Sequence, residues 1–164
     1  MKKYLFVIIL FISSCYYNSS AQNPENNIYN PYTDAEDQIR KAVLEAKETG
    51  KHVLLQVGGN WCPWCLRLHK FIKEDSEIDS LLHTDYVFVL INYSKENKNA
   101  EIMKKLEFPQ RFGFPVLVVL DEKGRRIHTQ NSAYLEKDKS YNRKLIIEFL
   151  KQWNKTALNL PKIK

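Results

Sequence analysis

The sequence contains only three cysteines, Cys15, Cys62 and Cys65, and this scarcity limits the sites that they can build. A structural zinc site normally takes four ligands, but there is no second Cys-x-x-Cys pair and only four histidines accompany this one. A covalent haem site needs a histidine directly after the second cysteine, where this chain has Leu66. The pattern therefore excludes haem attachment and argues against zinc.

The chain also lacks the usual marks of a nucleotide or metal cofactor. No glycine-rich fingerprint follows an apolar, strand-like run, and no group of acids and histidines has the spacing of metal ligands. No internal repeat is evident. We therefore expect neither a metal nor another cofactor.

Charge of one sign is not concentrated in any part of the chain. The formal net charge is +6, of which Lys2 and Lys3 contribute two. The other cations are interspersed with acids, for example over residues 45–51 and 136–139. This arrangement is typical of a solvated surface rather than a basic stripe, so we expect no nucleic-acid partner.

The N-terminus has the pattern of a secretory signal over residues 1–21. A short basic start precedes an apolar run over residues 5–12, which is too short to span a membrane, and small polar residues follow it. Two processing sites compete. Residues 12–15 resemble a bacterial lipobox, which would make Cys15 a lipidated first residue, whereas residues 19–21 resemble an ordinary signal-peptidase site that ends at Ala21.

Either cleavage would export the protein to the periplasm or cell envelope, where a disulfide can persist. The membrane attachment that we expect is a lipid on Cys15 or none. Residues 22–33 are rich in asparagine, proline and tyrosine and show no periodicity, so we expect a flexible N-terminal arm. Residues 34–164 remain for one domain with one sizeable core.

Hydrophobic periodicity and turn residues predict an alternation of helices and strands. The run over residues 86–91 is almost continuously apolar, which indicates a parallel strand covered on both faces. We expect Ser76 to cap the third helix. The predicted helices cover residues 34–49, 65–73, 77–83, 100–107 and 142–153, and the predicted strands cover residues 52–57, 86–91, 116–120 and 125–129, the last two forming a hairpin.

The most informative segment is Trp61-Cys62-Pro63-Trp64-Cys65, which follows an apolar strand and opens a helix. Free backbone N–H groups and the positive end of the helix dipole favour an anion there, so the pKa of the Cys62 thiol should be lowered. Cys62 is therefore the expected nucleophile. Cys65 should be more buried and should attack a mixed disulfide on Cys62, which releases the substrate and closes the bridge. Pro63 suits the first turn because its missing N–H is not needed there.

An inert structural disulfide between Cys62 and Cys65 is the simplest alternative for an exported protein. However, a bridge that closes a two-residue loop removes little chain entropy from the unfolded state. Stability alone is therefore a poor reason for a disulfide at this position.

Together these features resemble the thioredoxin-like family in its exported bacterial form. The resemblance rests on residues 61–65 after a strand, on residues 113–115 before the next strand, and on the turn over residues 121–124. It covers residues 34–153. It implies an α/β three-layer sandwich, with a central mixed sheet and helices on both faces.

The resemblance also implies a role for Gly113-Phe114-Pro115. Pro115 would be a cis-proline that faces the Cys-x-x-Cys motif, and the Phe114 backbone would pair with an extended substrate segment. From the residues alone, a trans proline that starts an edge strand is the alternative.

One position departs from the pattern of thioredoxin itself. Thioredoxin carries a buried acid six residues before the first cysteine, where it helps to move the proton of the second thiol, and this chain has Gln56 there. A neutral amide cannot act as that base, so the deprotonation of Cys65 must rely on water or on another group. We expect His69, seven residues past Cys62, to face solvent rather than to relay protons.

The Pro63-Trp64 insert resembles the Pro-aromatic insert of glutaredoxins and, loosely, the Pro-His insert of the oxidant DsbA, rather than the Gly-Pro of thioredoxin. This resemblance implies a less reducing couple, and the direction of electron flow stays open. The aromatic side chains can also form an apolar lip for a partner. We expect Trp61 to pack against the sheet and Trp64 to be exposed.

Two functions therefore compete. The first is a thiol–disulfide oxidoreductase of the cell envelope that acts on protein thiols and disulfides and exchanges electrons with a redox partner. The second is a non-catalytic module of the same fold that binds or chaperones exported proteins. The position of Cys62 at a helix start favours the first, and Gln56 with the aromatic lip favours the second. The expected substrate-binding residues are Trp61, Pro63, Trp64, Phe114 and Pro115.

Overall fold

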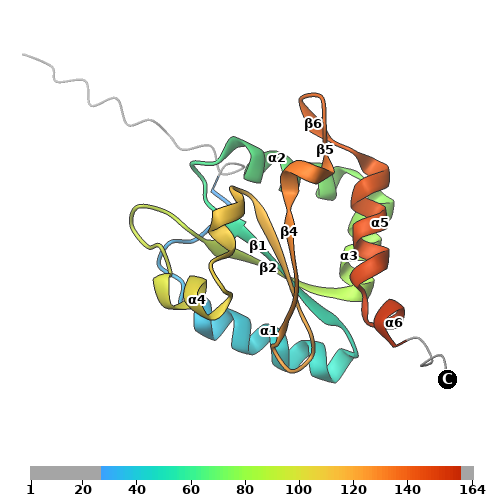
Figure 1. Cartoon of the computed structure of the whole chain (residues 1–164), viewed down its shortest axis with the longest axis horizontal. Coiled ribbons are helices and arrows are strands. Elements are labelled where there is room, and N and C mark those ends of the chain that lie inside the picture. Colours follow the sequence, from blue (N-terminus) through green and yellow to red (C-terminus); the bar gives the residue numbers. More distant parts are fainter. Residues whose placement is uncertain (1–26, 160–164) are drawn as a thin grey trace, which may run out of the picture.

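The computed structural model describes residues 27–159, which fold into an α/β sandwich around a four-stranded sheet (Figure 1). The expected signal over residues 1–21, with Cys15, lies outside the described residues. Residues 22–26 of the expected arm also lie outside them. Within residues 27–159, no helix is both long and apolar enough to cross a bilayer.

The sheet is mixed, with the strand order β2-β1-β3-β4. The central strand β1 (His52–Gly58) pairs in parallel with β2 (Tyr86–Asn92) and antiparallel with β3 (Val116–Leu120). The edge strand β4 (Arg126–Asn131) forms the predicted antiparallel hairpin with β3. The predicted mixed sheet is therefore confirmed.

One face of the sheet is covered by α1 (Ala35–Thr49) and α4 (Ala100–Lys105) (Figure 1). Successive side chains of a strand point to opposite faces, and alternate residues of β1 share one core cluster with these helices. The strand residues of this cluster include Val53, Leu55 and Val57.

The opposite face is covered by α2 (Pro63–Glu74), α3 (Ser76–Asp85) and α5 (Arg143–Trp153). Leu54 from β1 and Leu117 from β3 belong to the core cluster on this side. The predicted arrangement of helices on both faces is therefore confirmed. By the same alternation Gln56 lies on this face of β1, toward α2.

Local sequence signals explain where the helices begin. The Asp34 carboxylate accepts hydrogen bonds from the N–H groups of Glu36 and Asp37 and so caps α1. The prediction that Ser76 caps α3 is wrong. The Asp75 carboxylate accepts from Glu77 and Ile78 N–H instead, because an anion one residue earlier meets the positive end of the helix more favourably than a hydroxyl.

Short elements complete the fold and carry no periodicity that a sequence pattern could reveal. The hairpin of β5 (Glu136–Lys137) and β6 (Ser140–Tyr141) contacts the start of α2, where the Tyr141 hydroxyl donates a hydrogen bond to the Trp64 carbonyl. These short elements are η2 (Pro109–Phe112), η3 (Ser132–Leu135), β5 (Glu136–Lys137), β6 (Ser140–Tyr141) and α6 (Lys155–Leu158).

The expectation of a flexible arm is wrong for residues 27–33. Tyr29 is only 1% exposed, and its N–H and C=O groups both bond to the side-chain amide of Asn60, at 2.8 and 2.7 Å. The Asn97 amide donates to the Pro31 carbonyl at 3.1 Å. The segment lacks periodicity because it is held by side-chain hydrogen bonds and one buried ring rather than by regular structure.

Candidate active site

Cys62 and Cys65 form a disulfide at the junction of β1 and α2, with their Cα atoms 5.2 Å apart. Cys62 is the N-cap residue of α2, and its Sγ accepts a hydrogen bond from the Cys65 N–H at 3.1 Å. Cys62 is 3% exposed and Cys65 is 0% exposed. The helix-start position of Cys62 and the deeper burial of Cys65 therefore agree with the sequence analysis.

This position can stabilise negative charge on the Cys62 sulfur once the bridge is open. The Cys65 N–H already points at that sulfur, and the helix dipole has its positive end there. The first turn of α2 contains no acidic residue to oppose an anion. Pro63 occupies the first helical position, where its missing N–H leaves no partner unsatisfied.

The register of the sheet brings Pro115 to the motif. Val116 at the start of β3 pairs with Val57 near the end of β1, so the residues before β3 lie beside the loop that leads to Cys62. The Phe114–Pro115 peptide bond is cis, as the family resemblance implies. Phe114 is partly buried and packs against the cluster that holds both cysteines.

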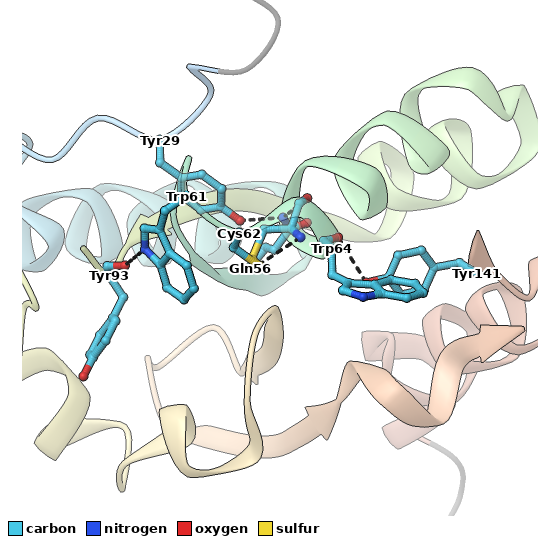
Figure 2. The surroundings of a disulfide bond; sticks show 8 residues. Tyr29, Gln56, Trp61, Cys62, Trp64, Tyr93 and Tyr141 are labelled. Carbon is cyan, nitrogen blue, oxygen red and sulfur yellow. Dashed lines mark hydrogen bonds between the residues drawn. A yellow bond between two sulfur atoms is a disulfide. The ribbon is translucent and has the colours of Figure 1, made fainter. Parts of the chain in front are cut away.

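The expected placement of the two tryptophans is wrong. Trp61 is 55% exposed, and its indole N–H donates to the Tyr93 carbonyl at 2.7 Å (Figure 2). Its ring packs edge-on against the Phe114 ring, with the two ring centres 5.3 Å apart. A side chain at Gly59 would collide with the indole, so the absence of a Cβ there lets Trp61 lie across the loop.

Trp64 is half-buried instead of exposed. Its ring packs edge-on against Tyr141 at 5.5 Å, and the Tyr141 hydroxyl donates to the Trp64 carbonyl at 3.2 Å (Figure 2). The Arg67 guanidinium lies over the indole ring, 4.5 Å from its centre. The β5–β6 hairpin thus covers a ring that the motif alone leaves free.

Gln56 is fully buried behind the bridge. Its side-chain N–H₂ group donates to the Tyr29 hydroxyl at 2.6 Å and to the Cys65 carbonyl at 3.1 Å (Figure 2). Tyr29 packs in one cluster with Cys62 and Cys65. Burial raises the pKa of the Tyr29 phenol well above its ordinary value, so this hydroxyl keeps its proton.

His69 does not face solvent as expected. Its ring is half-buried and stacks on Phe88, and its Nδ1 atom is buried without a hydrogen-bond partner among the described residues. Burial, followed by the positive charge of Lys73, lowers the pKa of the imidazole. His69 is therefore a packed residue of α2.

Sequence patterns missed three tyrosines around the motif, Tyr29, Tyr93 and Tyr141. Tyr29 packs with Cys62, the Tyr93 carbonyl accepts from Trp61 and the Tyr141 hydroxyl donates to the Trp64 carbonyl. No spacing rule connects residues so far apart in the sequence. An open groove of about 720 Å³ lies next to Trp61 and is lined by Tyr93, Lys95 and Lys98 among others. Over residues 27–159, no three His, Cys, Asp or Glu side chains gather into a metal site.

Comparisons with known proteins agree with this geometry. A curated relative, the disulfide bond reductase DsbH of Chlamydia pneumoniae, is 26% identical over 116 residues, which make up 63% of this chain and 70% of the relative. The crystal structure of a disulphide isomerase from Xylella fastidiosa Temecula1 superimposes with a TM-score of 0.68 at 26% identity, covering 77% of this chain and 95% of that one.

The oxidised C-terminal domain of DsbD from Neisseria meningitidis shares the fold, with a TM-score of 0.53 at 18% identity, over 76% of this chain and 100% of that one. The sequence profile of the thioredoxin-like domain matches residues 39–142. That span holds the redox bridge, the cis-proline and the sheet that joins them. The chain therefore belongs to the thioredoxin-like family, as a thiol–disulfide oxidoreductase-like protein with a Cys62–Cys65 disulfide.

Proposed function

We propose that this protein is a thiol–disulfide oxidoreductase of the cell envelope that exchanges disulfides with protein substrates. The observation that carries the proposal is the position of Cys62 as the N-cap residue of α2, with the Cys65 N–H directed at its sulfur. A purely structural disulfide does not need a position that stabilises a thiolate. A redox-active disulfide benefits from it, because a stabilised thiolate is both the attacking and the leaving group of exchange.

The exchange proceeds in two balanced steps, written here for reduction of a client. The Cys62 thiolate attacks the client disulfide, one client sulfur bonds to Cys62, and the other leaves as a thiolate that takes a proton from water. The Cys65 thiolate then attacks the Cys62 sulfur, the mixed disulfide breaks, and the second client thiol leaves. The client disulfide has then been reduced by two electrons, and the Cys62–Cys65 pair has been oxidised to a disulfide. The same steps in reverse oxidise a client.

The substrate site in this proposal surrounds the bridge. Trp61 presents more than half of its surface beside Cys62, and Pro63 is exposed at the helix start. We infer that an extended client segment lies along the Phe114 backbone next to Pro115, with its sulfur toward Cys62. Trp64 supports this surface from its contact with Tyr141.

The test is a trapping experiment with Cys65→Ser, which leaves Cys62 as nucleophile and removes the resolving thiol. We expect mixed disulfides between Cys62 and client proteins to accumulate and to disappear on reduction. The matched control, Cys62→Ser, keeps the Cys65 thiol but should trap nothing. Equal trapping by both variants, or none by Cys65→Ser, would contradict the proposed roles of Cys62 as nucleophile and Cys65 as resolving thiol.

The direction of exchange follows from the reduction potential of the Cys62–Cys65 couple. Potentials in related proteins run from about −270 mV for thioredoxin to about −120 mV for DsbA. The curated relative carries the name of a reductase, and one structural relative that of an isomerase. Equilibration with glutathione measures the potential, and a value near thioredoxin's would make this protein a reductase.

The envelope location rests on the basic and apolar pattern of residues 1–21. We propose that the mature protein begins either at a lipid-modified Cys15 or directly after Ala21. Mass spectrometry of the mature chain distinguishes the two products. Cys15→Ser should release the protein from the membrane fraction only if the lipid is present.

A second function, client binding without exchange, is favoured by exposed aromatic side chains, of which Trp61 lies next to Cys62 and the others lie in or just before η2. Trp61, Phe108 and Phe112 are 55%, 52% and 37% exposed. In that case both cysteine variants would keep client binding, and assays of insulin reduction or thiol oxidation would show no activity.

A further inference from the structure

The orientation of the Gln56 amide can be assigned from its neighbours. The Cys65 carbonyl lies 3.1 Å from one end of that amide and can only accept a hydrogen bond, so the N–H₂ end must face it. The same N–H₂ group then donates to the Tyr29 oxygen at 2.6 Å. The reverse orientation would set two oxygen acceptors against each other and leave a buried donor unpaired, whereas the assigned orientation leaves only the Gln56 Oε1 atom without a partner among the described residues.

It follows that the Tyr29 hydroxyl accepts from Gln56 and still has its own hydrogen to donate. No hydrogen bond donated by this hydroxyl is present among residues 27–159. Tyr29 is only 1% exposed, so bulk water does not freely supply an acceptor. A buried hydroxyl with an unused hydrogen costs free energy, which an acceptor that appears during turnover would recover.

The acceptor that we identify for the Tyr29 hydroxyl is the neighbouring sulfur of Cys65. A Cβ atom on Gly58 would overlap the Cys65 Sγ and would lie 3.0 Å from the Tyr29 oxygen, so the sulfur and the hydroxyl both lie against the position that a side chain at residue 58 would occupy. In the closed bridge that sulfur is a weak acceptor. When the bridge opens, Cys65 becomes a thiol and then a thiolate, and a thiolate is a much stronger acceptor.

We propose that Tyr29 donates its hydroxyl hydrogen to the Cys65 sulfur in the reduced protein and so stabilises the resolving thiolate. Gln56 positions that hydroxyl through its own hydrogen bond. This proposal rests on the proposed function, since it concerns the second step of exchange. The proposal also assigns a role to Gln56, which occupies the position of the buried acid of thioredoxin. In this site a neutral hydrogen-bond donor, Tyr29, takes the place of that acid.

The chemistry balances without a new reactant. The Cys65 thiol loses its proton to water, Tyr29 keeps its own proton, and the thiolate attacks the Cys62 sulfur of the mixed disulfide. The client sulfur leaves as a thiolate and takes up a proton from water. The other titratable groups near the cluster are Cys62 at the start of α2, Arg67 over Trp64, and Tyr141 on β6, and burial raises the pKa of Tyr141 so that it stays neutral.

The experiment measures the resolving step alone. Reduced protein is labelled on Cys62 with the chromophore 5-thio-2-nitrobenzoate at acid pH, and release of the chromophore by Cys65 is followed after jumps to higher pH. Loss of one hydrogen bond to the thiolate in Tyr29→Phe should raise the midpoint of the Cys65 titration by about one pH unit.

A change of this kind has opposite effects at the two ends of the pH range. Below the midpoint, fewer Cys65 side chains are ionised, and release should be about threefold slower in Tyr29→Phe. Above the midpoint, all are ionised, and the more basic thiolate should react about threefold faster. The two profiles therefore cross. A variant in which Cys65 is merely displaced would be slower at every pH, and that outcome overturns the proposal.

Tyr86→Phe is the matched control. Tyr86 is also a buried tyrosine, but its hydroxyl donates to the Leu150 carbonyl on the α5 side of the sheet. Its loss should lower stability without moving the release profile. If the wild-type protein takes no label on Cys62 or releases none, the proposed function fails; if it releases normally and Tyr29→Phe follows the same profile, only the role of Tyr29 fails.

A measurement on the unaltered protein covers the case in which Tyr29→Phe does not fold. In reduced protein labelled with ¹³C at the tyrosine ring carbon that bears oxygen, the Tyr29 signal should shift at the midpoint of the Cys65 titration, whereas the Tyr86 signal should not. A Tyr29 signal that stays constant through that titration overturns the proposal.

Discussion

Gly58 shows how closely the chain packs behind the disulfide. It is the last residue of β1, and its missing side chain leaves room for the Cys65 sulfur and the Tyr29 hydroxyl at once. The backbone of Gly58 is not in the left-handed region, so the requirement for glycine here is one of space rather than conformation.

We predict that Gly58→Ala destabilises the oxidised protein by about 1–3 kcal/mol, because the added methyl group overpacks a site with no spare volume. Urea unfolding measures the change. Gly50→Ala serves as control, since no described atom lies within 4 Å of its Cβ position and only its left-handed backbone is strained. The reasoning fails if Gly58→Ala is as stable as the wild-type protein.

His69 makes the stability of the fold depend on pH. Burial and then Lys73 lower the pKa of its imidazole in the folded state, while Asp79 opposes them. The unfolded chain therefore binds a proton more readily than the folded chain as pH falls below about 6.5. The stability that neutral His69 contributes is present above that pH and is lost on acidification toward the lower, folded-state pKa.

We predict that His69→Leu weakens this dependence, because leucine keeps an apolar contact with Phe88 and carries no proton. Unfolding free energies from urea titrations across the acid range give the slope for each protein. An identical slope in the variant and the wild-type protein would contradict the assignment of the effect to His69.

At the scale of elements, the loop between β1 and α2 is connected to the segment over residues 27–33. Asn60 receives the Tyr29 N–H and donates to the Tyr29 carbonyl, and its amide also donates to Asn27 at 2.6 Å. The loop that presents the redox motif and the segment that places Tyr29 behind it are thus held by one side chain.

We predict that Asn60→Ala frees this segment, with faster hydrogen exchange at the Tyr29 amide and a loss of about 1–2 kcal/mol in stability. The control is Asn142→Ala, which removes the cap of α5 and should cost about 1 kcal/mol while leaving exchange at Tyr29 unchanged. Equal exchange at Tyr29 in Asn60→Ala and the wild-type protein would argue against the connection.

At the scale of the whole molecule, the sheet separates two large apolar clusters that share its central strands, apart from the small cluster around the bridge. Leu117 of β3 belongs to the cluster under α2, α3 and α5, and Val118 belongs to the cluster under α1 and α4. Phe114 packs against the cluster under α1 and α4 and Trp64 against the other, and both also pack against the small cluster that holds the bridge, so both sides of the sheet support it.

We predict that Leu117→Ala lowers the unfolding free energy by about 2–5 kcal/mol, because it opens a cavity among buried side chains. Leu44→Ala, at a half-exposed position of α1, should change it by less than about 1 kcal/mol. Denaturant unfolding with fluorescence and circular dichroism should give coincident transitions for both variants. Separate transitions would show that the two clusters do not unfold together.

The sequence by itself determined the order of the longer helices and strands and the position of Cys62 at a helix start. Periodicity and caps act within a few residues, so Asp34 before α1 and the apolar runs of β1 and β3 could be interpreted without knowledge of the rest of the chain. The family resemblance added the cis-proline, which the structure contains.

Only the tertiary structure decided what surrounds the bridge. Trp61 is exposed, with its indole N–H hydrogen-bonded to the Tyr93 carbonyl. Trp64 is covered by Tyr141 of the β5–β6 hairpin, and Tyr29 is buried in one cluster with Cys65. Each of these outcomes depends on residues brought together across the sheet. Local sequence cannot encode them, because such contacts form only when the whole chain has folded.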